Sequence, residues 1–325
     1  MMTPAMDDHN GSNTGNPSFK SIRAAAERRG EWLELMPGRE LDLQQTEQRH
    51  TRMMQWLESQ SFPVKLLGRL HSKGEIKITG DRIRLRLFPA AEYGFEPRYD
   101  HPVEVLYEDD YILVVHKPAG MAVHPADQQD TRVTLAHAVA AHYESTGQDC
   151  AVRHVHRLDE DTTGPVLYAK NEFALSLMDE QMREKLIDRR YAALVQGNVS
   201  DQLTIIDEPI GKDRHHKQRR RVSPGGQSAV TFVEKVAGTK AASLVKLKLE
   251  TGRTHQIRVH MSYMGHPLIG DALYGGRSDL LDRQALHGEQ LAFVHPWTGE
   301  ETVVDDPWPS DMLQLAESLK LIGQE

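Results

Sequence analysis

The sequence has few of the features that mark secreted or membrane proteins. Its 325 residues include a single cysteine, Cys150. One cysteine excludes an intramolecular disulfide and fits the reducing cytoplasm, where we expect the protein to act. No apolar run approaches the about 18 residues of a transmembrane helix, so we expect no membrane association. The first residues, 1–22, are polar and lack a signal-peptide pattern, and they predict a disordered tail.

Patterns that hold metal ions are absent as well. The chain has 17 histidines but no HExxH motif and no cysteine pair that would bind zinc. His255 and His260 are five residues apart, a spacing that does not place two side chains on one face of a helix. We therefore predict that the protein uses neither a metal ion nor a cofactor.

Positive charge is scarce, since 39 lysines and arginines face 47 acidic residues and give a net charge of −8. From residue 278 onward there are ten acidic residues and only two basic ones. This segment therefore carries the whole net charge, and the residues before it are neutral on balance. They include the basic run KDRHHKQRRR, residues 212–221. Because local patches attract phosphate whatever the total charge, we interpret this run as an RNA contact through Arg219 and Arg220. The alternative is a solvated loop.

Residues 23–89 predict a small basic domain. Residues 53–57 and 62–70 have helical spacing, and residues 74–87 alternate apolar and charged side chains as a hairpin does, with its turn at Gly80. Two short helices and a basic hairpin resemble a degenerate form of the αL RNA-binding domain, which a ribosomal protein shares with many RNA-modifying enzymes. The alternative is a structural cap whose hairpin is charged for solubility.

The segment after this domain predicts a linker followed by an α+β domain. Residues 90–102 contain glycine and two prolines without periodicity and are interpreted as the linker, so residues 103–325 form the second domain. Strands outnumber helices there, and hairpins outnumber strand–helix–strand units, which favours a mixed, mainly antiparallel sheet with flanking helices. We expect strands near residues 103–107, 111–115, 166–169, 191–195, 229–236 and 244–249, and helices near 135–143 and 174–182 and, capped by Thr254, from there to 263.

The most informative segment is HRLDEDTTG, residues 156–164. It places Asp159 in a loop between Arg157 and a Thr-Thr-Gly turn, directly before a strand, and a rigid scaffold commonly presents a reactive carboxylate in this way. Such a carboxylate can attack a sugar carbon without a metal. Taken alone, however, an acid at this kind of position is more often a turn residue.

Three further segments carry candidate chemistry. Residues 189–191 (RRY) precede a strand, residues 249–260 (LETGRTHQIRVH) combine a strand, a glycine turn and a helix start, and residues 117–125 (KPAGMAVHP) form a proline-bounded loop. A guanidinium such as that of Arg258 would keep a nearby carboxylate ionised. The ring of Tyr191 is suited to stacking on a base, and its hydroxyl to proton transfer.

Taken together, these segments resemble the RluA-type family of RNA pseudouridine synthases. HRLDEDTTG is similar to the family signature HRLDxxTSG, and LETGRTHQIRVHM is similar to the motif L-x-TGR-[ST]-HQ-[IL]-R-VH. VLYEDDYILVVHKPAGMAVHP, GHPLIGDALYG and RQALHGEQLAFVHPWTGE continue the match in order, so that it covers about residues 103–301. Departures are Thr163 in place of the usual serine, Pro165 in place of an aliphatic residue and Arg189 in place of lysine. None of them changes a reacting group.

The resemblance implies a role for each candidate residue. Asp159 would be the nucleophile, Tyr191 the active-site tyrosine, Arg258 the basic partner of the aspartate, and Arg157 the residue associated with base flipping. The remaining residues that we expect to contact RNA are Arg253, His255, Lys117, Arg219 and Arg220.

The activity that the resemblance implies is isomerisation of uridine to pseudouridine in structured RNA, without metal or cofactor. Large-subunit (23S) ribosomal RNA is the first expected substrate and transfer RNA the second, with the protein acting as a monomer. Asp159 would attack the anomeric carbon directly or abstract a sugar proton to give a glycal, and the residues leave both routes open. Two other functions also remain open: an inactive RNA-binding protein, and a nucleosidase or glycosidase with Glu160 or Asp161 as a second carboxylate.

Overall fold

The computed structural model describes residues 26–43, 48–127 and 129–323. They form two compact units, one up to residue 87 together with 297–299, and the other from 88 to 296 and from 300 onward. The tail expected at residues 1–22 lies outside the described residues. Among the described residues, no helix combines the length and the apolar character that crossing a membrane requires.

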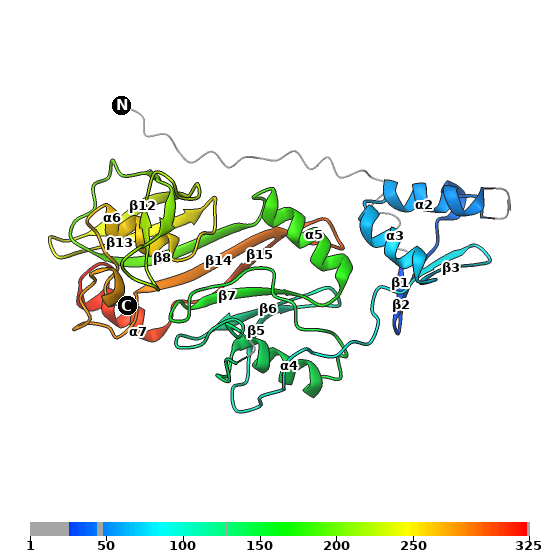
Figure 1. Ribbon diagram of the computed structural model, residues 1–325, viewed down its shortest axis with the longest axis horizontal. Coiled ribbons are helices and arrows are strands. Elements are labelled where there is room, and N and C mark those ends of the chain that lie inside the picture. Colours follow the sequence, from blue (N-terminus) through cyan, green and yellow to red (C-terminus); the bar gives the residue numbers. More distant parts are fainter. Residues whose placement is uncertain (1–25, 44–47, 128, 324–325) are drawn as a thin grey trace. The chain divides into compact units, whose positions relative to one another are not determined.

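The first unit is a small four-stranded antiparallel sheet with two helices (Figure 1). The expected helices are α2 and α3, and the expected hairpin is β3 and β4, with its turn at Gly80. The sequence did not reveal β1, whose three residues are all charged, or the four-residue β2. The bounds are β1 Glu27–Arg29, β2 Trp32–Leu35, the short 3₁₀ helix η1 Gly38–Glu40, α2 Arg49–Ser59, α3 Val64–Ser72, β3 Ile76–Thr79 and β4 Arg82–Leu85.

The second unit contains a six-stranded sheet in the order β15-β14-β8-β13-β12-β9, a three-stranded sheet β5-β6-β7 and the short hairpin β10-β11. Among the residues that the structure describes, every ladder of this unit is antiparallel, and one parallel bridge joins Thr163 to His287 of β14. The strands are β5 Glu104–Glu108, β6 Ile112–Lys117, β7 Gly164–Ala169, β8 Asp188–Gln196, β9 Ile205–Asp207, β10 Ile210–Lys212, β11 Arg220–Val222, β12 Val230–Gly238, β13 Ala242–Leu249, β14 Leu286–Val294 and β15 Glu301–Asp305. The predicted α+β fold with a mainly antiparallel sheet is confirmed.

Helices cover both faces of these sheets. The helices are α4 Leu135–Ser145, α5 Glu172–Arg183, α6 Gln256–Tyr263, α7 Ser310–Ser318 and the 3₁₀ turn η2 Ala272–Tyr274. Alternate residues of β8 point to opposite sides, as the pleat requires. Tyr191 and Ala193 pack with Ile257 of α6, whereas Ala192 packs with Met312 of α7. The helices α6 and α7 therefore cover opposite faces of the central strands, and α4 covers the three-stranded sheet (Figure 1).

Two expectations about local structure change. The proposed linker, residues 90–102, lies within the second unit, where Tyr93 and Phe95 pack against the core beneath α4. Thr254 does not cap α6. The helix begins one residue later than a Thr254 cap would place it, with His255 at the N-cap in the left-handed conformation (φ 59°). The Gln256 side chain closes the turn instead, because its oxygen accepts hydrogen bonds from the Thr251 hydroxyl and the Arg253 N–H.

Two glycines anchor the loop that contains Asp159. Gly164, the first residue of β7, has φ 138°, and a methyl group on it would lie 2.8 Å from the backbone of Gly288 in β14. The Gly288 N–H donates to the Thr163 carbonyl (2.8 Å), and the Thr163 hydroxyl lies 2.9 Å from Nδ1 of His287. The end of the loop is thus attached to the central sheet through a backbone contact that leaves no room for a side chain.

We expect Gly164→Ala to lower the free energy of unfolding by about 3 kcal/mol, because the new methyl group adds both a steric clash and backbone strain. Urea denaturation followed by circular dichroism measures the change. Gly147→Ala is the matched control, since Gly147 also has positive φ (67°) but meets no atom within 4 Å; it should cost about 1 kcal/mol. Equal losses in the two variants would show that the contact with Gly288 contributes nothing.

Candidate active site

Asp159 lies in an open cleft of about 600 Å³ in the second unit. Segments far apart in the sequence form its walls: the loop 156–159 with Thr162, residues 182–185 at the end of α5, the strand β8 with Tyr191, the turn 249–258 that leads into α6, and Leu286. The structure therefore brings together the three residues predicted to be catalytic, Asp159, Tyr191 and Arg258. It does so because β8 and β13 are neighbours in the sheet and the loop before β7 is attached to β14.

An ion pair orients the Asp159 carboxylate. Its Oδ2 accepts a hydrogen bond from Nη1 of Arg258 at 3.2 Å, and its side chain is 24% exposed. The other oxygen, Oδ1, accepts no hydrogen bond from the described residues. One carboxylate oxygen is thus held in place while the other has no hydrogen-bond partner among the described residues.

Arg258 is itself held by a second carboxylate. Its Nε and Nη2 donate to the two oxygens of Asp271 at 2.7 and 2.9 Å, and the Asp271 side chain is only 1% exposed. Burial opposes the charge of the guanidinium. The hydrogen bonds and charges of Asp271 and Asp159 outweigh this effect and raise the pKa of Arg258 above its ordinary value. The bidentate geometry fixes the plane of the guanidinium, so that Nη1 points at Asp159.

Tyr274 was not predicted as a site residue, yet it connects several residues that were. The guanidinium of Arg258 lies 5.0 Å from the centre of its ring and that of Arg219 lies 5.4 Å from it, distances typical of cation–π contacts. Its hydroxyl accepts from the Arg220 N–H (2.9 Å) and lies 2.8 Å from Nδ1 of His255.

Asp271 and Tyr274 act together because of the turn η2. Asp271 is the N-cap of η2 and Tyr274 its last residue, and the Tyr274 N–H donates to the Asp271 carbonyl at 3.1 Å. Both side chains contact Arg258. Both residues belong to the segment GHPLIGDALYG, which resembles the family but gave no role to either position. The sequence signal for their role was an aspartate followed three residues later by a tyrosine. This spacing predicts a shared contact only when the turn between the two residues is known.

His255 occupies the N-cap of α6 between the cleft and Tyr274. Its Nε2 lies 4.0 Å from Oδ2 of Asp159. Burial lowers the pKa of His255, and the charge of Asp159 opposes this effect only in part. At neutral pH the imidazole is therefore uncharged, and Arg258 supplies the positive charge next to the carboxylate.

Tyr191 forms part of the cleft wall and is 6% exposed. Burial raises the pKa of its hydroxyl above the ordinary value, and the negative charge of Asp159 acts in the same direction. The phenol is therefore protonated at neutral pH. This state suits stacking and hydrogen bonding better than it suits removal of a proton.

The predicted RNA-contacting arginines differ in their surroundings. Arg157 lines the cleft, is exposed and makes no hydrogen bond or ion pair with any described residue. Arg253 lines the same cleft and donates from Nε to the Ser228 carbonyl at 2.9 Å. Arg219 and Arg220 lie beside Tyr274, outside the cleft.

Lys117 requires a correction. It was expected to contact RNA, but its side chain is fully buried and its ammonium donates to the carbonyls of Pro118, Met121 and Glu160, each at 2.7 Å. Burial lowers the pKa of Lys117 to about 7, while the nearby Asp161 and Asp159 oppose the change. An ammonium enclosed by carbonyls cannot reach a phosphate. Lys117 instead holds the loop that carries Asp159 through its hydrogen bond to the Glu160 carbonyl.

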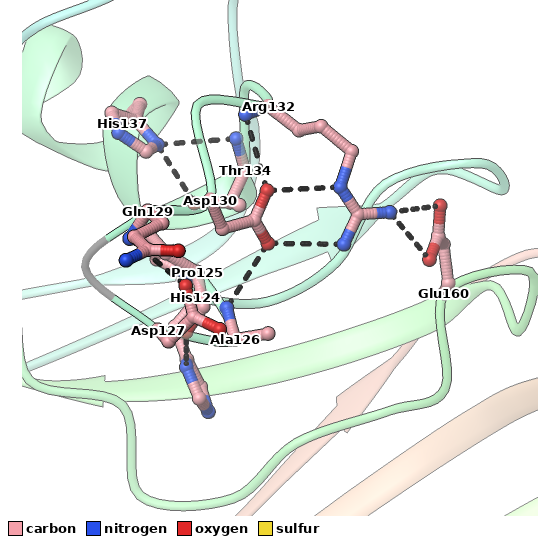
Figure 2. Close-up of polar contacts among 10 residues, drawn as sticks. All are labelled: His124, Pro125, Ala126, Asp127, Gln129, Asp130, Arg132, Thr134, His137 and Glu160. Atoms are coloured by element: carbon pink, nitrogen blue, oxygen red, sulfur yellow. Dashed lines mark hydrogen bonds and ion pairs between the residues drawn. The ribbon is translucent and has the colours of Figure 1, made fainter. Parts of the chain in front are cut away.

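A second contact joins the loop 118–134 to the loop that carries Asp159, as Figure 2 shows. The guanidinium of Arg132 lies between two carboxylates: Nη1 donates to both oxygens of Glu160 at 3.1 Å, and Nε and Nη2 donate to Asp130 at 3.0 Å. Glu160 is therefore held outside the cleft, and it is not among the residues that line it.

His156 lies at the base of the same loop and is buried without charge. Its Nε2 accepts from the Leu167 N–H at 3.3 Å, while Nδ1 is buried and has no partner among the described residues. Burial, assisted by the charge of Arg189, lowers the pKa of His156 to about 3. The imidazole therefore joins the loop to β7 only in its neutral form.

Comparison with known proteins gives consistent results. A family model described as RNA pseudouridylate synthase matches residues 111–263. An uncharacterized RNA pseudouridine synthase of Bacillus subtilis (strain 168), YhcT, is 44% identical over 81% of this chain and 86% of its own length. Ribosomal large subunit pseudouridine synthase D of Vibrio vulnificus (strain CMCP6) is 37% identical over 85% of this chain and 88% of its own length. The solved structure of Human RNA Pseudouridylate Synthase Domain Containing 4 has the same fold, with a TM-score of 0.56 at 22% identity, over 67% of this chain and 93% of that one.

We expect His156 to make stability sensitive to acid. Its folded pKa of about 3 lies below the ordinary 6.5, so the unfolded chain binds more protons between these values. The contribution of this group is complete above pH 6.5 and falls by up to about 1.4 kcal/mol per pH unit as the pH drops toward 3. Urea denaturation between pH 7 and 4 should give a shallower pH dependence for His156→Gln than for the wild type. Parallel pH profiles would rule out this role of His156.

Proposed function

The chain belongs to the RluA-type family of RNA pseudouridine synthases, which are isomerases, and we propose that Asp159 is the nucleophile with which it converts uridine to pseudouridine. The observation that carries the proposal is the state of the Asp159 carboxylate. Asp159 lines the cleft, where Arg258 binds its Oδ2 at 3.2 Å while its Oδ1 accepts no hydrogen bond from the described residues. A nucleophile needs both features, since the hydrogen bond to one oxygen orients the carboxylate and the oxygen without a partner can bond to a carbon atom.

The proposed reaction begins when the target uridine leaves its stack and enters the cleft, at a cost of a few kcal/mol. In the direct route, an oxygen of Asp159 bonds to the anomeric carbon C1′ as the bond from C1′ to N1 breaks. The detached uracil turns, its C5 bonds to C1′ and releases the aspartate, and C5 then loses its proton. In the glycal route, Asp159 instead removes a sugar proton as the base leaves, and it returns this proton to the sugar as C5 bonds to C1′. In both routes N1 gains a proton when C5 loses one. Both routes conserve the atoms of the nucleotide and begin with the same ionised carboxylate.

Tyr191 and Arg157 have supporting roles in this proposal. Tyr191 is protonated at neutral pH, so we assign it to stacking and to holding the detached uracil by its hydroxyl rather than to a phenolate base. Arg157 is exposed and has no partner among the described residues. Its guanidinium can therefore enter the space that the displaced base leaves in the RNA.

The two other functions considered from the sequence fit the site less well. A nucleosidase or glycosidase needs a second carboxylate as general acid. Glu160, which Arg132 holds, and Asp161 do not line the cleft, and Glu250, which does line it, is paired with Lys185. An inactive RNA-binding protein would have no use for a buried Asp271 that orients Arg258 toward Asp159.

We propose large-subunit (23S) ribosomal RNA as the substrate, because several relatives that match most of this chain are named ribosomal large subunit pseudouridine synthase D. The first unit, with its two helices and basic hairpin, is proposed to bind this RNA. On its hairpin strands β3 and β4, Lys77 binds no carboxylate among the described residues, whereas Arg82 and Arg84 pair with Glu34.

We expect Asp159→Asn to lower turnover by at least about 1,000-fold while RNA binding persists, because the amide keeps the shape of the side chain and loses its nucleophilicity. RNA labelled with tritium at C5 of uridine reports turnover by tritium release, and the product is identified by its reaction with carbodiimide. Asp201→Asn, the same change at an exposed position outside the cleft, should behave as the wild type. Residual turnover in Asp159→Asn would show that another group is the nucleophile, and free uracil from the wild type would identify a hydrolase.

Asp271→Asn should lower kcat by about 10- to 100-fold with little change in KM for the RNA, because a guanidinium that is no longer fixed holds Asp159 less accurately. The same assay measures both constants on protein shown to be folded by circular dichroism. Asp279→Asn is the matched control: Asp279 also binds an arginine through both oxygens, but on the exposed surface. A rise in KM at constant kcat would contradict the positioning role.

A further inference from the structure

A second cavity, of about 400 Å³, lies beside the cleft and shares Arg253 and Thr254 with it. Its walls come from the hairpin β10-β11, the turn 225–227 and the turn before α6. The three charged residues that line it, Lys212, Arg220 and Arg253, are all cations.

These cations are not neutralised. The side chains of Lys212 and Arg220 make no hydrogen bond or ion pair with the described residues, and Arg253 uses only its Nε, on the Ser228 carbonyl. Elsewhere in the same unit, Arg132, Arg258 and Arg283 each bind a carboxylate. In a chain with eight more acidic than basic residues, a cavity lined by three cations and no carboxylate is a marked local exception.

The positions of two cations in the hairpin β10-β11 also lower its stability. Lys212 and Arg220 are direct cross-strand partners, so their side chains lie on the same face. Like charges in this position destabilise a hairpin. An anion bound between the two side chains would remove the repulsion and use the charge of both.

The shape of the cavity suits a group on an extended chain. A methyl group on Gly226 would lie 2.5 Å from the backbone of Ile210, so the turn packs directly on β10 and its backbone closes one side. Thr254, which caps no helix, lines both the cavity and the cleft. The cavity therefore adjoins the cleft, so an RNA strand with a uridine in the cleft would have its neighbouring phosphodiester close to this cavity.

We infer that this cavity binds one backbone phosphodiester of the RNA next to the flipped uridine, with Lys212 and Arg220 as its principal ligands. The inference rests on the proposed function, since it supposes RNA in the cleft. Contacts also connect the cavity to the cleft. The backbone N–H of Arg220 donates to the Tyr274 hydroxyl, and the Tyr274 ring contacts Arg258.

The test uses the full-length protein and a fluorescein-labelled oligouridylate of twelve nucleotides, titrated at several sodium chloride concentrations. Each phosphate that a protein neutralises contributes about 0.7 to the slope of log K against log salt for a single strand. The double variant Lys212→Gln/Arg220→Gln should lower the slope by about 0.7 and weaken binding about ten-fold at low salt. Lys240→Gln, an exposed lysine outside both cavities, should leave the slope unchanged.

Three results would overturn the inference. The first is a slope in the double variant equal to that of Lys240→Gln, which would remove any phosphate contact. The second is a fall of about 1.4, which would mean two separate phosphates. The third is displacement of the oligonucleotide from the wild type by low millimolar inorganic phosphate at constant ionic strength, which would assign the cavity to free phosphate. The tritium assay of the wild type is independent of all three, so turnover with an unchanged slope would reject this subsite alone.

Discussion

The ionic triad of Asp159, Arg258 and Asp271 is the interaction on which the rest of the second unit depends. A buried charge is costly unless it is paired, and removing one partner of such a pair leaves an uncompensated charge. Asp271 is almost completely buried, so Arg258 has to remain where both of its Nε-side donors meet this carboxylate. The remaining nitrogen, Nη1, then has one direction left, and that direction leads to Asp159. The Asp159 carboxylate, the proposed nucleophile, is thus oriented through Asp271, a residue that does not line the cleft.

The surrounding structure supplies what the triad needs from both sides. On one side, Lys117 donates to the Glu160 carbonyl from beneath the loop, and the Gly164 contact attaches the end of that loop to β14. On the other side, the turn η2 presents Asp271 and Tyr274 together. Each of these contacts is made by backbone atoms or by a buried side chain. The Oδ1 atom of Asp159 therefore makes none of the hydrogen bonds that hold the loop. A carboxylate with that freedom can change its bonding during a reaction without loosening the fold.

The sequence was sufficient for the parts of this arrangement that depend on local pattern. Alternating apolar residues and helical spacing predicted most strands and helices, and the motif around Asp159 predicted that Tyr191 and Arg258 would meet it. The missing parts depend on tertiary contacts. The role of Asp271 requires the 3₁₀ turn that aims it at Arg258, and the burial of Lys117 requires the carbonyls of three separate residues around it. Thr254 looked like a helix cap because threonine favours that position, but the Gln256 side chain satisfies the same turn. The strand β1 was missed because its three residues are all charged, and β2 because it is only four residues long.

The uneven distribution of charge along the chain reflects a difference between the segments that build the sheet and those that line the cleft. An enzyme that binds RNA needs positive charge where the backbone passes, and elsewhere it gains solubility from negative charge. The segment from residue 278 onward carries the excess of acids, and it contributes β14, β15 and α7, which build and cover the sheet. The segments that line the cleft and the neighbouring cavity contribute Arg157, Arg220 and Arg253 with no bound carboxylate among the described residues. A net charge of −8 therefore describes the scaffold and not the surface that meets the substrate. For a protein of this kind, the charges that matter for binding are the cations that no carboxylate neutralises.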